Sequence, residues 1–260
     1  MQQIIFTIAL TIISKAFLLR DYLTRRIGQP RPTQTTIAAT DHQILSGKNL
    51  LQAVFLSPTQ AEPKAALLLC HGIGETTERW FAAQQLLATN GVASLVFDYS
   101  GYGRSTGAII ASQCEQDAIA AFHYLQTLTK APTSILGFSM GTGIAAAIID
   151  KIPAQKLILC AAFTSFKDAA LSIGFPKALA FLVPPIWNTK QTLNNCEIPT
   201  LIVHGEKDKL FPITMAADLL TACNSKPKLI LVPNLAHDDP YYRPDMSYWG
   251  AIISHLQIQP

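Results

Sequence analysis

The fold of this 260-residue chain is decided by the stretch Gly137-Phe138-Ser139-Met140-Gly141, which places one serine between two glycines. Residues 134–136 before it form a short apolar run typical of a buried strand, and residues 143–149 after it form an Ala-rich run typical of a helix start. A serine between a strand and a helix lies on a tight, strained turn, and its hydroxyl points away from the sheet. Because side chains two residues before and after it would collide, we expect glycine at both places.

The composition indicates a well-packed globular protein of one large or two small domains. Hydrophobic residues make up 49% of the chain and charged residues 14%, which excludes a disordered protein. The net charge is only +3, and no basic cluster is interleaved with aromatic residues, so we expect no nucleic-acid partner. The cysteines are scattered without a CxxC pair, which favours reduced, buried thiols over a zinc site or a disulfide framework. They are Cys70, Cys114, Cys160, Cys196 and Cys223.

Residues 1–34 are predicted to form an apolar helix and a linker ahead of a globular domain at 35–260. Residues 4–19 are mostly apolar, with their polar side chains along one narrow stripe. The run is short for a spanning helix, Lys15 interrupts it, and it lacks the basic start and cleavage site of a secretory signal. Residues 1–26 therefore span a membrane, lie on it or dock on the protein, and the sequence leaves all three open. Because the basic residues follow the apolar run, we expect a cytoplasmic location, with this helix as a candidate membrane anchor.

Apolar runs alternate with helical segments through the rest of the chain. A hairpin is expected from a weak strand at 36–39 and a better one at 50–56, around a turn at 46–49. Near-continuous apolar strands separated by amphipathic helices are typical of a parallel sheet covered on both faces, so the fold class is α/β. The further strands are expected at 65–70, 92–97, 134–138, 157–161, 200–204 and 229–232, and the helices at 78–89, 114–129, 140–151, 212–223 and 241–257.

The segment between 161 and 200 interrupts this alternation. It is expected to hold one extra helix at 168–183 and an irregular stretch at 184–187. Long excursions at such a point are often lids, so we predict a short helical lid at about 166–195. Its aromatic residues Phe175, Phe181 and Trp187 either line an apolar pocket or anchor the segment.

Polar side chains follow the predicted strands at the points where they end, and ligands of open α/β sheets bind beyond these carboxyl ends. Ser139, Asp208 and His237 each follow one such strand, in that order. A serine hydroxyl needs a base to remove its proton, and an imidazole base needs an acid that fixes its tautomer and stabilises the imidazolium. The sequence therefore predicts Ser139 as the nucleophile, His237 as the general base and Asp208 as the orienting acid.

Other residues compete for these roles. Asp168, after the preceding strand, and Asp238, next to the proposed base, are alternatives for the acid. Of the six histidines, only the proposed base follows the last strand in a polar loop, whereas His71 and His204 end strands beside glycine and are expected to shape loops. Asp98 is expected to hold its own Gly-rich turn through side-chain to backbone hydrogen bonds.

The order serine, acid, histidine and the strand before each of them resemble the α/β-hydrolase superfamily, over roughly residues 45–258. The loop at 98–105 and the small lid resemble its branch of serine aminopeptidase-like and membrane-associated acyl hydrolases. The resemblance implies an α/β-hydrolase fold with about eight strands, and an oxyanion hole made by the backbone N–H groups of Ile73 and Met140. Family members often carry Gly-His at the base position, whereas this chain has Ala236-His237, a change expected to adjust only the loop backbone.

These features predict a serine hydrolase that cleaves a carboxylic ester or thioester through an acyl-serine intermediate, without a metal or organic cofactor. The apolar lid and the N-terminal helix favour a small-molecule substrate with an apolar acyl chain. An aminopeptidase-like peptidase, or a lyase or acyltransferase with the same triad, is an alternative. A non-catalytic ligand receptor on the same fold is another, because fold does not determine activity. The sequence predicts no oligomeric state.

Overall fold

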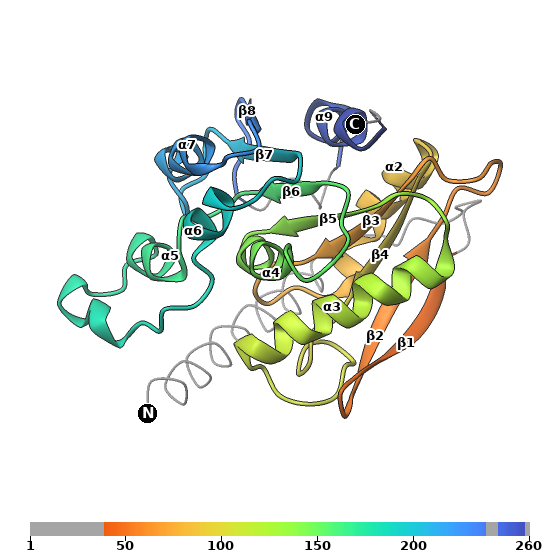
Figure 1. The fold of residues 1–260 in the computed structure, drawn as a ribbon, viewed down its shortest axis with the longest axis horizontal. Coiled ribbons are helices and arrows are strands. Elements are labelled where there is room, and N and C mark those ends of the chain that lie inside the picture. Colours follow the sequence, from red (N-terminus) through yellow and green to blue (C-terminus); the bar gives the residue numbers. More distant parts are fainter. Residues whose placement is uncertain (1–38, 238–243, 258–260) are drawn as a thin grey trace, which may run out of the picture.

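The computed structural model describes residues 39–237 and 244–257, which form one eight-stranded sheet and the helices around it (Figure 1). The predicted N-terminal helix and linker at 1–34 lie outside the described residues, as does the alternative acid Asp238. The strands are β1 (Thr40–Ser46), β2 (Asn49–Leu56), β3 (Ala65–Cys70), β4 (Val92–Phe97), β5 (Thr133–Phe138), β6 (Leu157–Cys160), β7 (Thr200–Gly205) and β8 (Lys228–Val232).

The sheet is the mostly parallel α/β sheet that the sequence predicted. Its strands lie in the order β1-β2-β4-β3-β5-β6-β7-β8. β2 is antiparallel to both β1 and β4, and every other neighbouring pair is parallel. The carboxyl ends of β3 to β8 therefore meet at one edge of the sheet, where the chemistry was expected.

Two groups of helices cover the two faces of the sheet. In β3, Ala66, Leu68 and Cys70 pack into one core cluster, and the alternate residues 65, 67 and 69 pack into the other. The first cluster is completed by α3, α4 and α7, and the second by η1, α2 and α9 (Figure 1). All five cysteines are free and buried, as predicted. The bounds of these six helices are η1 (Thr77–Trp80), α2 (Phe81–Thr89), α3 (Ala111–Leu128), α4 (Met140–Ile148), α7 (Ile213–Ala222) and α9 (Met246–Gln257).

The first strand was predicted at the wrong place. The structure begins β1 at Thr40, whereas the sequence indicated 36–39, of which 36–38 lie outside the described residues. β1 is an edge strand in which only Ile44 and Ser46 are buried, so it carries no apolar run that would reveal it. The predicted hairpin with β2 is present, and Gly47 in its two-residue turn has a φ of +58°, which favours glycine.

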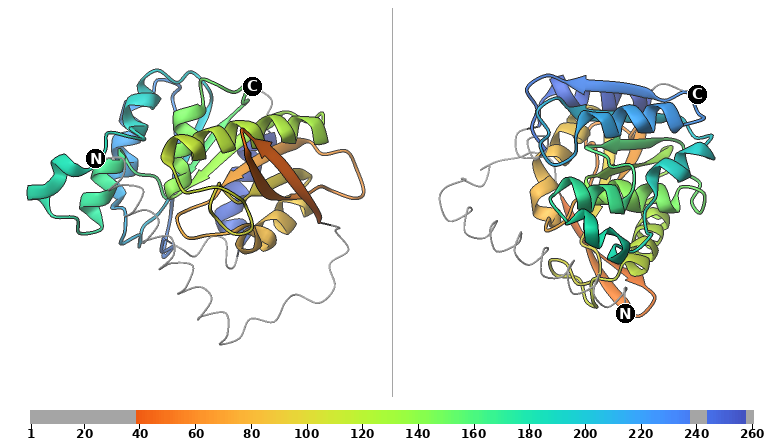
Figure 2. Two further views of the ribbon diagram at one scale, coloured as in Figure 1. Left: turned by 90° about the horizontal axis from the view of Figure 1, so that it is seen from below. Right: turned by 90° about the vertical axis from the view of Figure 1, so that its left-hand side faces the viewer.

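The single helix predicted at 168–183 is also wrong. The segment between β6 and β7, residues 161–199 and here called the β6–β7 insertion, holds α5 (Phe166–Ser172), the 3₁₀ helix η2 (Lys177–Leu182) and α6 (Thr189–Asn194). Gly174, with a φ of +100°, and Pro176 separate α5 from η2 because neither favours a continuous helix. η2 has no buried residue and projects away from the sheet (Figures 1 and 2).

Candidate active site

Ser139 lies on the predicted tight turn between β5 and α4. Its φ of +50° and ψ of −118° are a strained conformation for a residue with a side chain. Hydrogen bonds hold the turn on both sides of the serine. Its N–H donates to the carbonyl of Cys160 in β6 at 3.0 Å, and its carbonyl accepts from the N–H and the hydroxyl of Thr142 at 2.9 and 2.6 Å.

The two glycines of this turn are required for different reasons. A Cβ on Gly137 would lie 2.6 Å from backbone atoms of Gly141 and Thr142, which is the collision expected within the turn. A Cβ on Gly141 would instead strike the carbonyl of Cys70 at the end of β3 and lie 2.9 Å from that of His71. The expected reason for Gly141 is thus corrected: it allows the start of α4 to lie against the end of β3.

The structure brings the three predicted side chains together. His237 Nε2 lies 2.9 Å from Ser139 Oγ, and His237 Nδ1 lies 2.7 Å from Asp208 Oδ2. All three are buried, with Ser139 6% and His237 8% exposed. Because an ionised carboxylate only accepts hydrogen bonds, His237 carries its proton on Nδ1 and turns a lone pair on Nε2 toward the serine hydroxyl.

The loops after β7 and β8 are joined by backbone hydrogen bonds, which set the distance between acid and base. The Glu206 N–H donates to the Val232 carbonyl at 3.1 Å, and the Lys207 N–H donates to the Leu235 carbonyl at 3.0 Å. Gly205 allows this approach, because a Cβ there would strike the carbonyl of Leu235. Two residues that are 29 positions apart in sequence therefore meet.

Asp208 is fixed by its own loop. Its Oδ1 accepts the N–H groups of Leu210 and Phe211 at 2.8 and 2.9 Å, and its Oδ2 faces His237. Burial alone would raise the pKa of this carboxyl, but the hydrogen bonds and the neighbouring histidines outweigh burial and lower it. Asp208 is therefore ionised at neutral pH.

His204 supports the same loop, as its position beside glycine predicted. Its Nε2 lies 3.0 Å from the carbonyl of Phe211 and 3.7 Å from Asp208 Oδ2. Burial lowers the pKa of His204, so its ring is neutral at pH 7 and donates the Nε2 proton to that carbonyl.

The alternative acid Asp168 has a different task. Its Oδ2 accepts the hydroxyls of Thr164 and Ser165 at 2.6 and 2.7 Å, and its N–H donates back to Ser165 Oγ at 3.1 Å. This is the N-terminal cap of α5. Asp208, and not Asp168, lies at the histidine.

The predicted oxyanion loop follows β3. His71 Nδ1 donates to the Gly72 carbonyl at 2.8 Å, and burial lowers the pKa of His71 to about 4, so its ring is neutral at pH 7. The next amide belongs to Ile73. Because α4 begins against the end of β3, Ile73 and Met140 lie on neighbouring elements, and neither amide donates a backbone hydrogen bond to another described residue.

The Gly-rich loop after β4, residues 98–105, contacts both the loop after β3 and Met140. As predicted, the buried carboxylate of Asp98 accepts backbone N–H groups, from Thr77 at 2.8 Å and Arg104 at 3.2 Å. Tyr102 of this loop donates its hydroxyl to Met140 Sδ at 3.7 Å, and the rings of Tyr102 and His71 are 5.4 Å apart. No role was predicted from the sequence for this tyrosine.

No role was predicted from the sequence for Glu75. This residue is 4% exposed, and its Oε2 accepts the Gly72 N–H at 2.9 Å and the Trp80 indole N–H at 3.0 Å. A carboxylate three residues after the amide that it binds is a known local pattern at helix starts and turns. The spacing from Gly72 to Glu75 was therefore the available signal.

Among the aromatic residues of the β6–β7 insertion, Trp187 takes the anchoring role, and the pocket-lining role stays a prediction. Trp187 is 4% exposed and donates its indole N–H to Glu115 Oε1 at 3.1 Å, so it anchors the insertion to α3. Its ring also packs against Phe166 at a centroid distance of 5.6 Å. Phe181 is 69% exposed and lies on η2.

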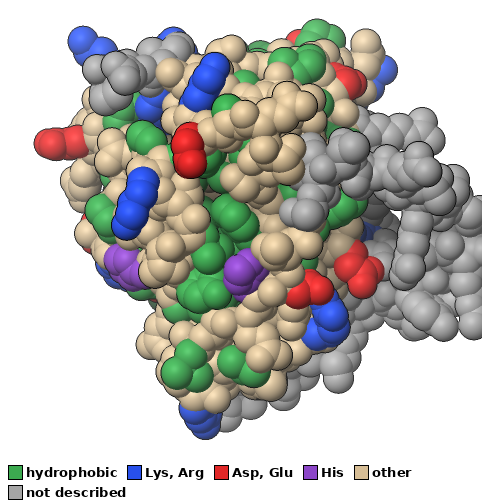
Figure 3. All heavy atoms as spheres, turned by 90° about the vertical axis from the view of Figure 1, so that its right-hand side faces the viewer, with side chains coloured by type: hydrophobic (Ala, Val, Ile, Leu, Met, Phe, Trp, Pro, Cys, Tyr) green, Lys and Arg blue, Asp and Glu red, His purple; other side chains and the backbone are tan. Residues whose placement is uncertain are grey.

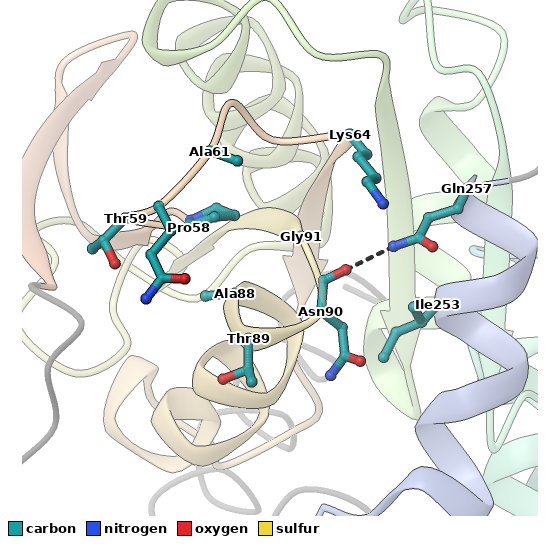
Figure 4. Close-up of a pocket in the computed structure, with 11 residues that line it drawn as sticks. Pro58, Thr59, Ala61, Lys64, Ala88, Thr89, Asn90, Gly91, Ile253 and Gln257 are labelled. Atoms are coloured by element: carbon teal, nitrogen blue, oxygen red, sulfur yellow. Dashed lines mark hydrogen bonds between the residues drawn. The ribbon is translucent and has the colours of Figure 1, made fainter.

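A pocket of about 600 Å³ lies at the other end of the sheet (Figure 4). Lys64 and Gly91, which help to line it, directly precede β3 and β4, so it lies at the amino ends of these strands and away from Ser139. Basic and acidic side chains are interspersed on the face at this end (Figure 3). Within residues 39–237 and 244–257, no group of three His, Cys, Asp or Glu side chains is placed to hold a metal ion.

Comparisons with known proteins agree with this architecture. An esterase of Pyrococcus furiosus superposes with a TM-score of 0.71 over 88% of this chain and 96% of its own, at 17% identity, which shows the fold. An uncharacterized protein of Mycobacterium tuberculosis strain H37Rv is 26% identical over 181 residues, 67% of this chain and 63% of its own length. The lysophosphatidylserine lipase ABHD12 of Danio rerio is 26% identical over 154 residues, 52% of this chain and 40% of its own. The chain thus spans less than two thirds of either curated relative.

The family model for serine aminopeptidase S33 matches residues 61–196. The match includes Ile73, Ser139 and Met140 and ends before Asp208 and His237, whose assignment depends on the geometry above. Because the match covers more than half of the sequence, the chain belongs to the serine aminopeptidase S33 family of α/β hydrolases.

Proposed function

We propose that this protein hydrolyses a carboxylic ester or thioester through an acyl intermediate on Ser139. The observation that carries the proposal is the pair of contacts made by one imidazole. His237 lies 2.9 Å from the serine hydroxyl through Nε2 and 2.7 Å from Asp208 through Nδ1. This arrangement removes a proton from an alcohol at neutral pH, which is the task that limits serine as a nucleophile.

In the first half of the reaction, Ser139 Oγ attacks the substrate carbonyl carbon while its proton passes to His237 Nε2. The imidazolium that forms is stabilised by the ionised Asp208. When the tetrahedral intermediate collapses, the bond to the leaving alkoxide or thiolate breaks and the imidazolium returns its proton to that group. In the second half, water loses a proton to His237 and attacks the acyl carbon. The bond from that carbon to Ser139 Oγ then breaks, the imidazolium returns the proton to Oγ, and the carboxylic acid is released.

The negative charge of each tetrahedral intermediate develops on the former carbonyl oxygen. We assign the backbone N–H groups of Ile73 and Met140 as the two donors that meet it. Such donors act only as the charge appears, and losing one typically lowers the rate by about 10²–10³.

We propose that the β6–β7 insertion is a lid that faces a lipid surface and that the acyl chain is apolar. Three apolar side chains of this insertion are largely exposed: Ile173 by 55%, Leu179 by 42% and Phe181 by 69%. The whole insertion carries three lysines and two acidic residues, a net charge of +1, which is compatible with an anionic interface. No helix within residues 39–237 and 244–257 has the length and apolar character needed to cross a bilayer. Membrane association through residues 1–26 is part of the same proposal.

Labelling with a fluorophosphonate, followed by a substrate panel, tests this function. The probe should modify Ser139, and Ser139→Ala should abolish labelling and lower kcat by about 10⁶. The panel compares p-nitrophenyl esters of increasing chain length with acyl-CoA and aminoacyl-p-nitroanilide substrates. Preference for the anilides would establish the peptidase, and a folded protein that neither reacts with the probe nor turns over any substrate would establish the receptor.

A further inference from the structure

The Ile73 amide depends on how Gly72 is held. The Gly72 carbonyl and the Ile73 N–H belong to one planar peptide group and point in opposite directions. Fixing this carbonyl, which His71 Nδ1 does at 2.8 Å, therefore helps to fix the direction of the Ile73 N–H. Two peptide groups meet at the Gly72 Cα, one with His71 and one with Ile73. Because glycine has the widest choice of φ and ψ, anchoring only one of these groups leaves the other free to rotate.

Glu75 anchors the other peptide group. Its Oε2 accepts the Gly72 N–H at 2.9 Å, so the two peptide groups that meet at the Gly72 Cα are held from opposite sides. Gly72 is also confined sterically. A Cβ there would lie 3.1 Å from the ring of Phe138 and 3.3 Å from Cδ of Glu75. Phe138 directly precedes Ser139, and its ring lies 5.3 Å from that of His237.

The carboxylate of Glu75 is itself held by the core. The Trp80 indole N–H donates to the same Oε2 at 3.0 Å, and Trp80 is 1% exposed. Its ring packs against Phe138 at 6.0 Å and Trp249 of α9 at 6.5 Å between centroids. A continuous line of contacts therefore runs from α9 through Trp80 and Glu75 to the oxyanion loop.

We propose that Glu75 is a positioning residue of the oxyanion hole. Its buried carboxylate fixes the His71–Gly72 peptide group and so helps to direct the Ile73 N–H toward the reacting oxygen. This inference rests on the proposed esterase function. The alternative is that Glu75 merely stabilises the turn at 72–75, which would make its loss a matter of folding and not of transition-state stabilisation.

Paired oxygen and sulfur substrates separate the two explanations. A thionoester places sulfur where an ester places its carbonyl oxygen, and sulfur accepts hydrogen bonds more weakly, so an oxyanion hole assists the ester more. In Glu75→Ala, kcat for a p-nitrophenyl ester should fall by about 10² with KM within about twofold, and the ester-to-thionoester ratio of kcat/KM should fall at least about tenfold. Glu75→Gln keeps an amide oxygen that accepts both N–H groups, so it should stay within about threefold of the wild type.

The matched control is Glu78→Ala, which removes an exposed carboxylate three residues along the same segment and should leave the ratio unchanged. Trp80→Phe removes the indole N–H but keeps an apolar ring, and should lower the ratio by a smaller factor. If Glu75→Ala does not fold, Trp80→Phe distinguishes a positioning role of Glu75 from mere stabilisation of the turn at 72–75. Equal losses on both substrates, or a Glu75→Gln variant as impaired as Glu75→Ala, would overturn the inference. An inactive, unlabelled wild type would overturn the proposed function instead.

Discussion

Replacing Asp208 by asparagine should reverse the tautomer of His237 without disturbing the fold. Oδ1 accepts the N–H groups of Leu210 and Phe211 at 2.8 and 2.9 Å, so an asparagine must place its carbonyl oxygen on that side. Its NH₂ group then faces His237 Nδ1, which must accept a hydrogen bond instead of donating one. The imidazole proton moves to Nε2, 2.9 Å from Ser139 Oγ, and Nε2 can no longer take the serine proton.

The expected loss in kcat for Asp208→Asn is about 10⁴, the size typical of an imidazole held in the wrong tautomer. This loss corresponds to about 5 kcal/mol in the activation barrier. The assay is steady-state hydrolysis of a short p-nitrophenyl ester at pH 8. Tm, measured in parallel, should fall only by the contribution of the ionised carboxylate, because both backbone N–H groups keep an oxygen acceptor.

The matched control is Asp168→Asn, since that carboxylate receives the hydroxyls of Thr164 and of Ser165, the N-terminal cap of α5. We expect its kcat to stay within about tenfold of the wild type, because its loss is one of local stability. The reasoning would be refuted by an Asp208→Asn variant that keeps a tenth or more of the wild-type kcat. A larger loss in Asp168→Asn would move the role of the acid to that residue.

Three further outcomes are expected. Trp187→Ala should lower the free energy of unfolding, measured in urea, by about 3–5 kcal/mol, because a buried indole that donates to Glu115 is lost. The control Ile173→Ala, at an exposed position, should change it by about 0.5 kcal/mol or less. Equal effects of the two substitutions would contradict the anchoring role of Trp187. The pKa of Asp208 is lower in the folded protein than in the unfolded chain, so its contribution to stability is present above about pH 4 and is lost as pH falls through the folded value. As the pH is lowered from 6 to 2, the free energy of unfolding should therefore fall more steeply for the wild type than for Asp208→Asn. Parallel curves for the two proteins would contradict this contribution of Asp208. Deleting residues 1–26 should move the protein from the pellet of phosphatidylcholine–phosphatidylserine vesicles to the supernatant, and unchanged sedimentation would rule out membrane binding through that segment.

The inner parallel strands β3 to β7 were predictable because every residue in them is buried. A strand such as β3, with all six residues buried, must be a continuous apolar run bounded by polar turns, and its limits matched the prediction. β1 lies at the edge of the sheet with most of its residues exposed, so burial does not restrict its composition. The break between α5 and η2 was signalled by Gly174 and Pro176, but the apolar residues around them concealed it.

The residues of the site also differ in how far the sequence predicts them. Ser139, Asp208 and His237 follow strands whose carboxyl ends share one edge, so strand limits and chain order suffice to bring them together. Gly141 and Glu75 depend instead on contacts that local sequence does not specify. Gly141 is required by the Cys70 carbonyl of another strand, and the orientation of Glu75 depends on a tryptophan held by α9. The residues proposed to do the chemistry are therefore visible in their motifs, whereas the residue proposed to direct an oxyanion donor becomes visible only when the core is assembled around it.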